Sequence, residues 1–283
     1  MSGSKPLHFT KMHGTGNDFV MIDNLAQSFD SNELRLLSQK ICHRNYGVGS
    51  DGLIAVELGS LTNFQMRMFN PDGSESEACG NGTRCFAKYL LQKRLIQSTE
   101  FSIQTQKKIL EIEIQKNGHI TVNMGKPTFT RAEIGITGDL NSTFFEEAIT
   151  FEGVKLKGTA VSMGNPHLIL FTDDLKKIPL SKWGPLLENH PLFPNRINVH
   201  FVQMIDQANL IQKTWERGAG ITLACGSGAC AVAVAAHQIK NTDPKVKIKL
   251  PGGELQINYL TSKEVKMIGP AETVFEGFLN FPV

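Results

Sequence analysis

Two cysteines in closely similar local settings are the residues of this chain best suited to proton-transfer chemistry. Cys79 is followed by Gly-Asn-Gly and a helix-like run, and Cys225, about half a chain length later, is followed by Gly-Ser-Gly and a run of small apolar residues. Glycine lets the backbone turn sharply and approach a ligand closely, and the helix that follows points its N–H groups at that ligand. Such a position favours a carboxylate as guest and thiolate over thiol.

If the two loops face each other, they form a symmetric acid–base pair. One thiolate removes a proton from the carbon beside a bound carboxylate, and the opposite thiol returns a proton to the other face. An ordinary thiol is only about 3% ionised at pH 7, so we expect the site to lower the thiol pKa. The alternative is that both loops are glycine turns with inert thiols. The polar neighbours Asn81, Arg84 and Ser227 argue against it, because an apolar core would exclude them.

Composition and cysteine usage exclude several other classes of function. Lys and Arg number 29 and Asp and Glu 27, without a basic stripe interleaved with aromatics, so no nucleic acid partner is expected. The sequence has no apolar run of transmembrane length and no signal-peptide core, so we expect no membrane partner and a cytoplasmic location. Five cysteines predict reduced thiols, and their spacing predicts no metal site. Cys42, Cys85 and Cys230 are expected to be buried as small hydrophobes.

The elements that must position the two cysteines recur along the chain. Gly16-Asn17 is echoed by Gly164-Asn165, and a helix and then a hairpin follow each cysteine. The run after Cys225 is apolar all round, which is typical of a helix buried on every side. We therefore expect an α+β fold of two pseudo-symmetric domains from an internal duplication, each a curled strand-rich sheet wrapped around a central helix. The active site would lie in the cleft between them.

The expected domain boundaries follow from the same repeat. Residues 1–126 form the first repeat, residues 127–270 the second, and the tail 271–283 packs back on the first repeat or on a partner subunit. Helices are expected at 31–43, 82–93 and 229–239. Strands are expected at 64–70, 101–105, 109–114, 120–124, 159–163, 198–204, 246–250 and 255–259, with a two-residue hairpin turn at Asn117-Gly118.

The ordered motifs resemble those of the diaminopimelate epimerase family over essentially the whole chain. The longest match runs from Asn70 through Asp72-Gly73-Ser74 and Cys79-Gly80-Asn81-Gly82 to Arg84; others are Lys11–Phe19, Gly164–His167, Glu216–Gly218 and Ala224–Gly228. The resemblance implies interconversion of LL- and meso-2,6-diaminopimelate without a cofactor, independent of pyridoxal phosphate, in lysine biosynthesis. It also implies two similar domains and a homodimer.

Site residues are implied by the same resemblance. Cys79 would be the base toward the LL isomer and Cys225 the base toward the meso isomer, while His167 and Glu216 would tune the thiol pKa values. Substrate-binding positions would be Asn17, Asn70, Gly80, Asn81, Asn165, Asn198, Glu216, Arg217, Gly226 and Ser227. Each has a structural alternative: the asparagines could cap their own backbone, His167 could be a buried structural histidine, and Glu216-Arg217 could be a solvated pair.

Two positions depart from the family pattern, and two other functions stay open. Gly52 stands where some members have a substrate-contacting Gln, and Phe275 stands where a Tyr near the dimer contact is common. One alternative function is a proline or hydroxyproline racemase of the same architecture, against which Arg217 argues because a substrate with one carboxylate does not need it. The other is a redox sensor or ligand-binding protein whose two thiols form a regulatory disulfide.

Overall fold

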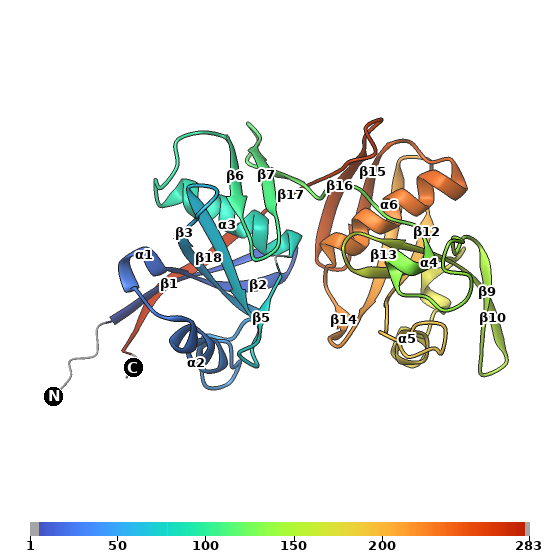
Figure 1. Cartoon of the computed structure of the whole chain (residues 1–283), viewed down its shortest axis with the longest axis horizontal. Coiled ribbons are helices and arrows are strands. Elements are labelled where there is room, and N and C mark those ends of the chain that lie inside the picture. The colour runs from blue at the N-terminus through green and yellow to red at the C-terminus, as the bar shows by residue number, and fades with distance from the viewer. Residues whose placement is uncertain (1–5, 78, 281–283) are drawn as a thin grey trace. The chain divides into compact units, whose positions relative to one another are not determined.

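The computed structural model describes residues 6–77 and 79–280, which form two compact units (Figure 1). The first unit runs up to Val122 and resumes at Gly269, and the second spans Asn123–Ile268. The predicted boundaries at 126/127 and 270/271 lie close to these divisions. Residues 281–283 of the expected tail, like Ala78 beside the first cysteine, lie outside the described residues.

The first unit consists mostly of strands, with one long helix following the first cysteine. Its strands are β1 (Pro6–Gly14), β2 (Asn17–Asp23), β3 (Gly52–Leu58), β4 (Phe64–Phe69), β5 (Glu75–Ser76), β6 (Glu100–Gln104), β7 (Ile109–Ile114), β8 (Ile120–Asn123) and β18 (Glu272–Asn280). Its helices are α1 (Asn24–Gln27), α2 (Ser31–Ile41) and α3 (Gly80–Gln92).

The second unit has a similar succession of elements. Its strands are β9 (Glu147–Phe151), β10 (Val154–Ser162), β11 (Pro166–Phe171), β12 (Asn198–Met204), β13 (Asn209–Glu216), β14 (Gly220–Thr222), β15 (Lys245–Leu250), β16 (Gly253–Tyr259) and β17 (Val265–Gly269). Its helices are α4 (Arg131–Ile134), the short 3₁₀ helix η1 (Leu175–Lys177), α5 (Leu180–Glu188) and α6 (Gly226–Lys240).

The strand pairings of the two units follow one another in the same order. In the first unit, β1–β2 is antiparallel, β2–β3 parallel, β3–β4 antiparallel, β4–β6 parallel, and β6–β7 and β7–β8 antiparallel. In the second unit, the equivalent pairs β10–β11, β11–β12, β12–β13, β13–β15, β15–β16 and β16–β17 have the same directions. The mixed sheets and the repeated order confirm the expected α+β duplication.

A helix that begins directly after each cysteine forms the centre of each unit. In the first unit, α3 packs against β1, β2, β3 and β7, and in the second, α6 packs against β10, β11, β12, β15 and β16 (Figure 1). Every residue of α6 from Gly228 to Ala236 is buried, which explains why its sequence is made of small apolar side chains. Helix α3 carries a similar buried stretch, including Arg84.

A second helix closes the other face of each sheet. Helix α2 places Leu34, Leu37 and Ile41 in a core with strands of the first unit, and α5 places Leu180 and Leu187 in the core of the second. The capping box between Asp30 and Glu33 explains why α2 was predictable. Helix α5 was not predicted, because Pro185 lies inside it and its N-cap, Pro179, makes no side-chain capping bond.

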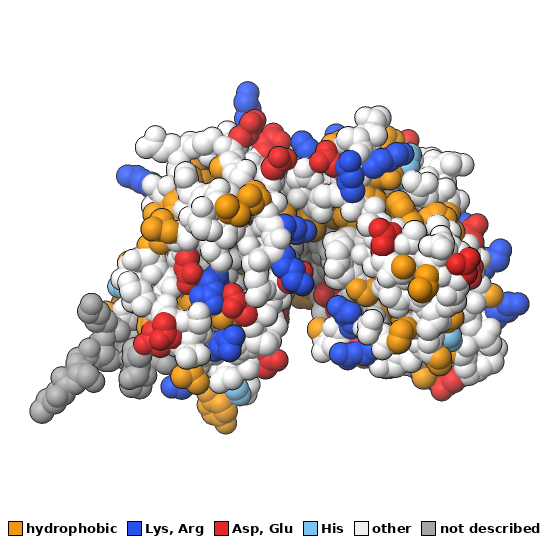
Figure 2. Space-filling view, in the orientation of Figure 1, with side chains coloured by type: hydrophobic (Ala, Val, Ile, Leu, Met, Phe, Trp, Pro, Cys, Tyr) orange, Lys and Arg blue, Asp and Glu red, His pale blue; other side chains and the backbone are white. Residues whose placement is uncertain are grey.

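The expected tail forms β18, which pairs antiparallel with β1 in the first unit. Predicted strand ranges agree with the structure to within a few residues. The two-residue turn expected at Asn117-Gly118 is wrong, because three residues, 116–118, join the paired Gln115 and His119, and of these three only Gly118 has a positive φ, of 82°. In the part of the chain that the structure describes, no helix combines the length and apolar character needed to cross a membrane. On the face seen in Figure 2, basic and acidic side chains are interspersed over both units.

Candidate functional site

Cys79 is the N-cap residue of α3, so its side chain lies among the first N–H groups of the helix. Its extended backbone (φ −102°, ψ 146°) ends the preceding loop, and the Gly82 amide donates a hydrogen bond to Sγ at 3.2 Å. Glycine at position 82 leaves room for the sulfur, because a Cβ there would lie 3.1 Å from Cys79 Sγ and 2.9 Å from Ile54 Cδ1. The helix was expected to begin at Gly82, whereas it begins at Gly80, which brings the thiol into the first turn.

Asn17 and Asn81, both predicted to bind substrate, lie beside this thiol. The Asn17 Oδ1 atom accepts from Asn81 Nδ2 at 3.2 Å and lies 3.9 Å from Cys79 Sγ. Arg84, which is fully buried, donates from Nη1 to Asn81 Oδ1 at 3.0 Å and from Nε to the Pro270 carbonyl at 3.0 Å. The Asn81 amide is therefore oriented by a charged group, and that group also ties Pro270, just before β18, to α3.

A network of charged groups holds Asn17 from the other side. Asn17 Nδ2 donates to Asp51 Oδ2 at 2.7 Å, and Arg44 bridges Asp51 and Asp18. Burial raises the pKa of Asp18, but hydrogen bonds from Arg44 and Lys11 outweigh it and lower that pKa to about 2. Asp18 is therefore a carboxylate at neutral pH, and its ion pairs with Lys11 and Arg44 hold this network together.

The described contacts of Asn70 and Gly52, in the first unit, are structural. Asn70 Nδ2 donates to Ser74 Oγ at 2.9 Å within the turn that precedes β5, so its described bond holds that turn. Gly52 begins β3 and is buried, and a Cβ there would lie 3.0 Å from the Phe69 carbonyl oxygen. A longer side chain at this position would require the strand to shift.

Cys225 is the N-cap residue of α6 and is the more enclosed of the two thiols, with 5% of its surface exposed. Burial and the charge of Glu216 raise its pKa well above the ordinary value, although the Gly228 amide and Ser227 act in the other direction. The expectation that its surroundings lower the thiol pKa is wrong for Cys225, because desolvation outweighs the helix end. At neutral pH Cys225 is a thiol.

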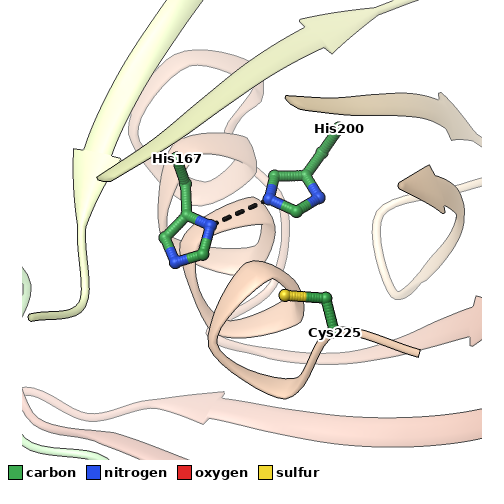
Figure 3. Close-up of side chains that lie close together, drawn as sticks. All are labelled: His167, His200 and Cys225. Carbon is green, nitrogen blue, oxygen red and sulfur yellow. Dashed lines mark hydrogen bonds between the residues drawn. The ribbon is translucent and has the colours of Figure 1, made fainter. Parts of the chain in front are cut away.

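A chain of hydrogen bonds leads from Cys225 into the core of the second unit. The Sγ atom lies 3.8 Å from Ser227 Oγ, which accepts from Asn165 Nδ2 at 3.4 Å. Asn165 Oδ1 lies 2.9 Å from His167 Nε2, and His167 Nδ1 lies 2.9 Å from His200 Nε2 (Figure 3). The predicted residues Asn165, His167 and Ser227 are thus brought together beside the thiol.

Both imidazoles are buried and neutral. Burial lowers the pKa of His200 to about 3, and burial together with the neighbouring His200 and Arg217 lowers the pKa of His167 well below its usual value. The resemblance placed His167 where it would tune the thiol pKa. In the structure its direct partners are Asn165 and His200, while Glu216 is the charged residue that shifts the pKa of Cys225.

His167, His200 and Cys225 are also the residues of the described chain that could hold a metal ion. Their ligand atoms all lie within 4.8 Å of one another, and all three side chains are buried. Two imidazoles and a thiolate suit a soft cation such as Zn²⁺. The two facing nitrogens are nevertheless hydrogen-bonded to each other at 2.9 Å, so a cation would have to displace the proton between them. The sequence-based expectation of no metal considered cysteine spacing alone and did not include His200.

Asn198, Glu216 and Arg217 lie at the ends of β12 and β13. Asn198 Nδ2 donates to the Pro166 carbonyl at 2.8 Å, and its Oδ1 accepts from the Arg217 amide at 3.0 Å, so it joins the loops before β11 and after β13. The Glu216 carboxylate accepts from Thr222 Oγ1 at 2.5 Å. The Arg217 guanidinium donates to the Asn195 carbonyl at 3.1 Å. Asn198 thus has a structural role of its own, whatever it binds.

The hydrogen-bond chain ends at three residues that were not predicted from the sequence: His200, Gln212 and Thr214. His200 Nδ1 lies 3.0 Å from Thr214 Oγ1 and 3.1 Å from Gln212 Nε2. All three are buried polar residues on strands, His200 on β12 and the other two at alternate positions of β13. The signal was available, because His200 follows Asn198 by two residues and so faces the same side of the strand. Its contact with His167 could not be predicted without knowing the register in which β11 and β12 pair.

Comparison with known proteins agrees with the motifs. The family model "Diaminopimelate epimerase" matches residues 9–130 and 159–274. The diaminopimelate epimerases of Moorella thermoacetica and Bacillus cytotoxicus are 42% and 40% identical, over 98% and 97% of this chain and 100% and 98% of their own. A hydroxyproline epimerase from Agrobacterium vitis shares the fold, with a TM-score of 0.70 at 12% identity over 99% of this chain and 94% of its own. The chain belongs to the diaminopimelate epimerase family.

Proposed function

We propose that the protein interconverts LL- and meso-2,6-diaminopimelate without a cofactor, using Cys79 and Cys225 as its two acid–base groups. The observation that carries the proposal is that each cysteine is the N-cap of the central helix in one of two units with the same order of strand pairings. An acyl-transfer enzyme would need one thiol and a neighbouring base, whereas stereochemical inversion needs two groups that act on opposite faces of one carbon.

The proposed reaction exchanges one proton for another. In the LL-to-meso direction the Cys79 thiolate takes the α-proton, so a C–H bond breaks and an S–H bond forms. The Cys225 thiol gives its proton to the opposite face of the carbon and is left as the thiolate, ready for the reverse reaction. The raised pKa of Cys225 supports its role as proton donor. The Gly82 amide, which donates to Cys79 Sγ, supports a thiolate on the other side.

The substrate carboxylate would be held where the two central helices begin. Backbone amides of Gly80-Asn81 and Gly226-Ser227 belong to the first turns of α3 and α6, the end at which a helix favours an anion. Such donors stabilise the negative charge that develops when the α-proton leaves. Asn17, Asn70, Asn165, Asn198, Glu216 and Arg217 would bind the remaining ammonium and carboxylate groups of the substrate. Glu216 suits an ammonium and Arg217 suits a carboxylate.

The proposal is tested with purified, reduced protein and LL-diaminopimelate, with no added cofactor. We expect meso product by chiral chromatography, and loss of that activity in both Cys79→Ala and Cys225→Ala with circular dichroism unchanged. No product from folded wild-type protein, or epimerisation retained in either alanine variant, would overturn it. L-proline and hydroxyproline serve as controls for the alternative racemase function, and we expect neither to react. A regulatory thiol pair would instead give no turnover and a reversible disulfide.

A homodimer in the cytoplasm is the state that we propose for the enzyme. Strand β18 exposes large apolar side chains, with Phe275 47% and Phe278 68% exposed, beside β1. Phe275 also contacts Phe9 edge to face, so it adds to this apolar surface. Light scattering should give twice the chain mass, and Phe278→Glu should shift it toward the monomer. A wild-type monomer at assay concentration would exclude the dimer.

A further inference from the structure

His200 is a buried imidazole of the second unit to which the proposed reaction gives no task, yet its ring lies against the first turn of α6, directly after Cys225. It contacts His167 on β11, Thr214 and Gln212 on β13, and the first turn of α6. A Cβ added to Gly228 would lie 2.3 Å from the His200 ring and 3.0 Å from Cys225 Sγ. The imidazole therefore packs directly against the backbone that carries the thiol.

We propose that His200 is a positioning residue, which fixes the tautomer of His167 and thereby the orientation of the Asn165 amide beside Cys225. The proton order follows from the partners along the chain. The carbonyl oxygen Asn165 Oδ1 can only accept, so His167 carries its proton on Nε2. A neutral His167 must then accept at Nδ1, so His200 carries its proton on Nε2. His200 Nδ1 in turn accepts from Thr214 or Gln212.

The consequence reaches Cys225 through Asn165. With its oxygen held by His167, the Asn165 amide turns its NH₂ group toward Ser227, whose hydroxyl lies 3.8 Å from the Cys225 sulfur. If His167 took the other tautomer, Asn165 would have to present its NH₂ group to the imidazole and its oxygen to Ser227. The Ser227 hydroxyl would then donate its proton to Asn165 and could no longer donate it to a substrate carboxylate. His200 thus selects the orientation that suits an anionic substrate.

The same hydrogen-bond order argues against a resident cation among His167, His200 and Cys225. A metal between them would need lone pairs on both facing nitrogens, whereas the hydrogen-bond order places a proton there. The charged groups around the pair are Glu216 at the end of β13, Arg217 after it, and Cys225 when ionised on α6. The two imidazoles hydrogen-bond to Asn165, Thr214, Gln212 and each other, and none of these is a carboxylate that would favour a charged imidazole.

The first test reads the tautomers directly and does not depend on catalysis. Two-bond ¹H–¹⁵N spectra of ¹⁵N-histidine-labelled protein should show His167 and His200 as neutral Nε2–H imidazoles, unchanged from pH 8 to pH 5.5. Signals are assigned by their loss in His167→Gln and His200→Gln. In His200→Phe, His167 should show both tautomers. Nδ1–H tautomers in the wild type, or a single Nε2–H tautomer for His167 in His200→Phe, would overturn the proposal. So would one equivalent of Zn²⁺ bound in a His200-dependent manner.

The second test is kinetic and rests on the proposed epimerase function. His200→Phe loses one orienting hydrogen bond and should lower kcat/KM about tenfold, mostly through KM, because the carboxylate donors are misplaced. His200→Gln can still donate to His167 Nδ1 and should recover activity to within about threefold of the wild type. Val199→Ala, which truncates a buried neighbour on the same strand, is the packing control. In it, His167 and His200 should both remain Nε2–H tautomers. Equal loss in the Phe and Gln variants would show that His200 is only structural.

Discussion

Lowering the pH should destabilise the second unit through its buried histidines, and the size of the effect can be worked out for His200. An unfolded histidine binds a proton below about pH 6.5, whereas folded His200 stays neutral until about pH 3. Between these values the unfolded state binds more protons, so stability falls as the pH falls. From pH 7 to pH 5 the linkage relation gives a loss of about 2 kcal/mol from His200 alone. His167, whose pKa is lowered as well, adds to it.

Tryptophan fluorescence isolates this effect, because both tryptophans, Trp183 and Trp215, belong to the second unit. Urea unfolding followed by fluorescence at pH 7, 6 and 5 should show the loss in the wild type. His200→Phe and His200→Gln cannot titrate, so both should lose about 2 kcal/mol less over this range, whatever their stability at pH 7. If either variant has the same pH dependence as the wild type, His200 is not the neutral, desolvated group described above.

Three further predictions concern packing and charge elsewhere in the fold. Gly228→Ala should lower the free energy of unfolding by about 1–3 kcal/mol and remove most of the activity, because its Cβ would overlap the His200 imidazole. Gly153→Ala, in an open turn with φ 77°, is the control: urea unfolding should show a loss of about 1–2 kcal/mol with the activity intact. Burial raises the pKa of Cys42 to about 11, so the stability this thiol contributes is present below pH 9 and is lost as the pH rises to 11. The melting temperature of Cys42→Ala should therefore fall less steeply with pH between 9 and 11 than that of the wild type. Equal slopes for the two proteins would refute this. Arg84→Met leaves two buried acceptors, the Pro270 carbonyl and Asn81 Oδ1, without their donor, and should destabilise the first unit by about 3 kcal/mol or more. Hydrogen exchange in β1 and β18 measures this loss. Unchanged protection of these strands would contradict the role given to Arg84.

Local sequence features predicted the position of each thiol, because a glycine turn followed by a helix is encoded in a few neighbouring residues. Cys79 and Cys225 both cap the central helices, and the equivalent pairs Asn17 with Asn81 and Asn165 with Ser227 followed from the repeat. The order of strand pairings was not predictable in detail, because parallel pairs such as β2–β3 join segments separated by a helix.

The surroundings of Cys225 could not be predicted, because they depend on tertiary packing. The direction of its pKa shift is set by burial, which depends on strands far away in the sequence. The link between His167 and His200 depends on the parallel register of β11 and β12, in which Ile169 pairs with His200. A one-residue change of register would turn the His200 side chain to the other face of the sheet.

Solvent-deuterium labelling in the first turnovers is the most direct test of the two-thiol mechanism. LL-diaminopimelate is incubated with the protein in D₂O, and substrate and product are separated and analysed by mass spectrometry while conversion is still small. Because the base that removes the proton is not the acid that replaces it, each meso molecule should carry one deuterium, while unreacted LL substrate should carry none. Unlabelled meso product, or deuterium in the LL pool at the same rate as in product, would show that one group acts on both faces and would contradict the assignment of Cys79 and Cys225.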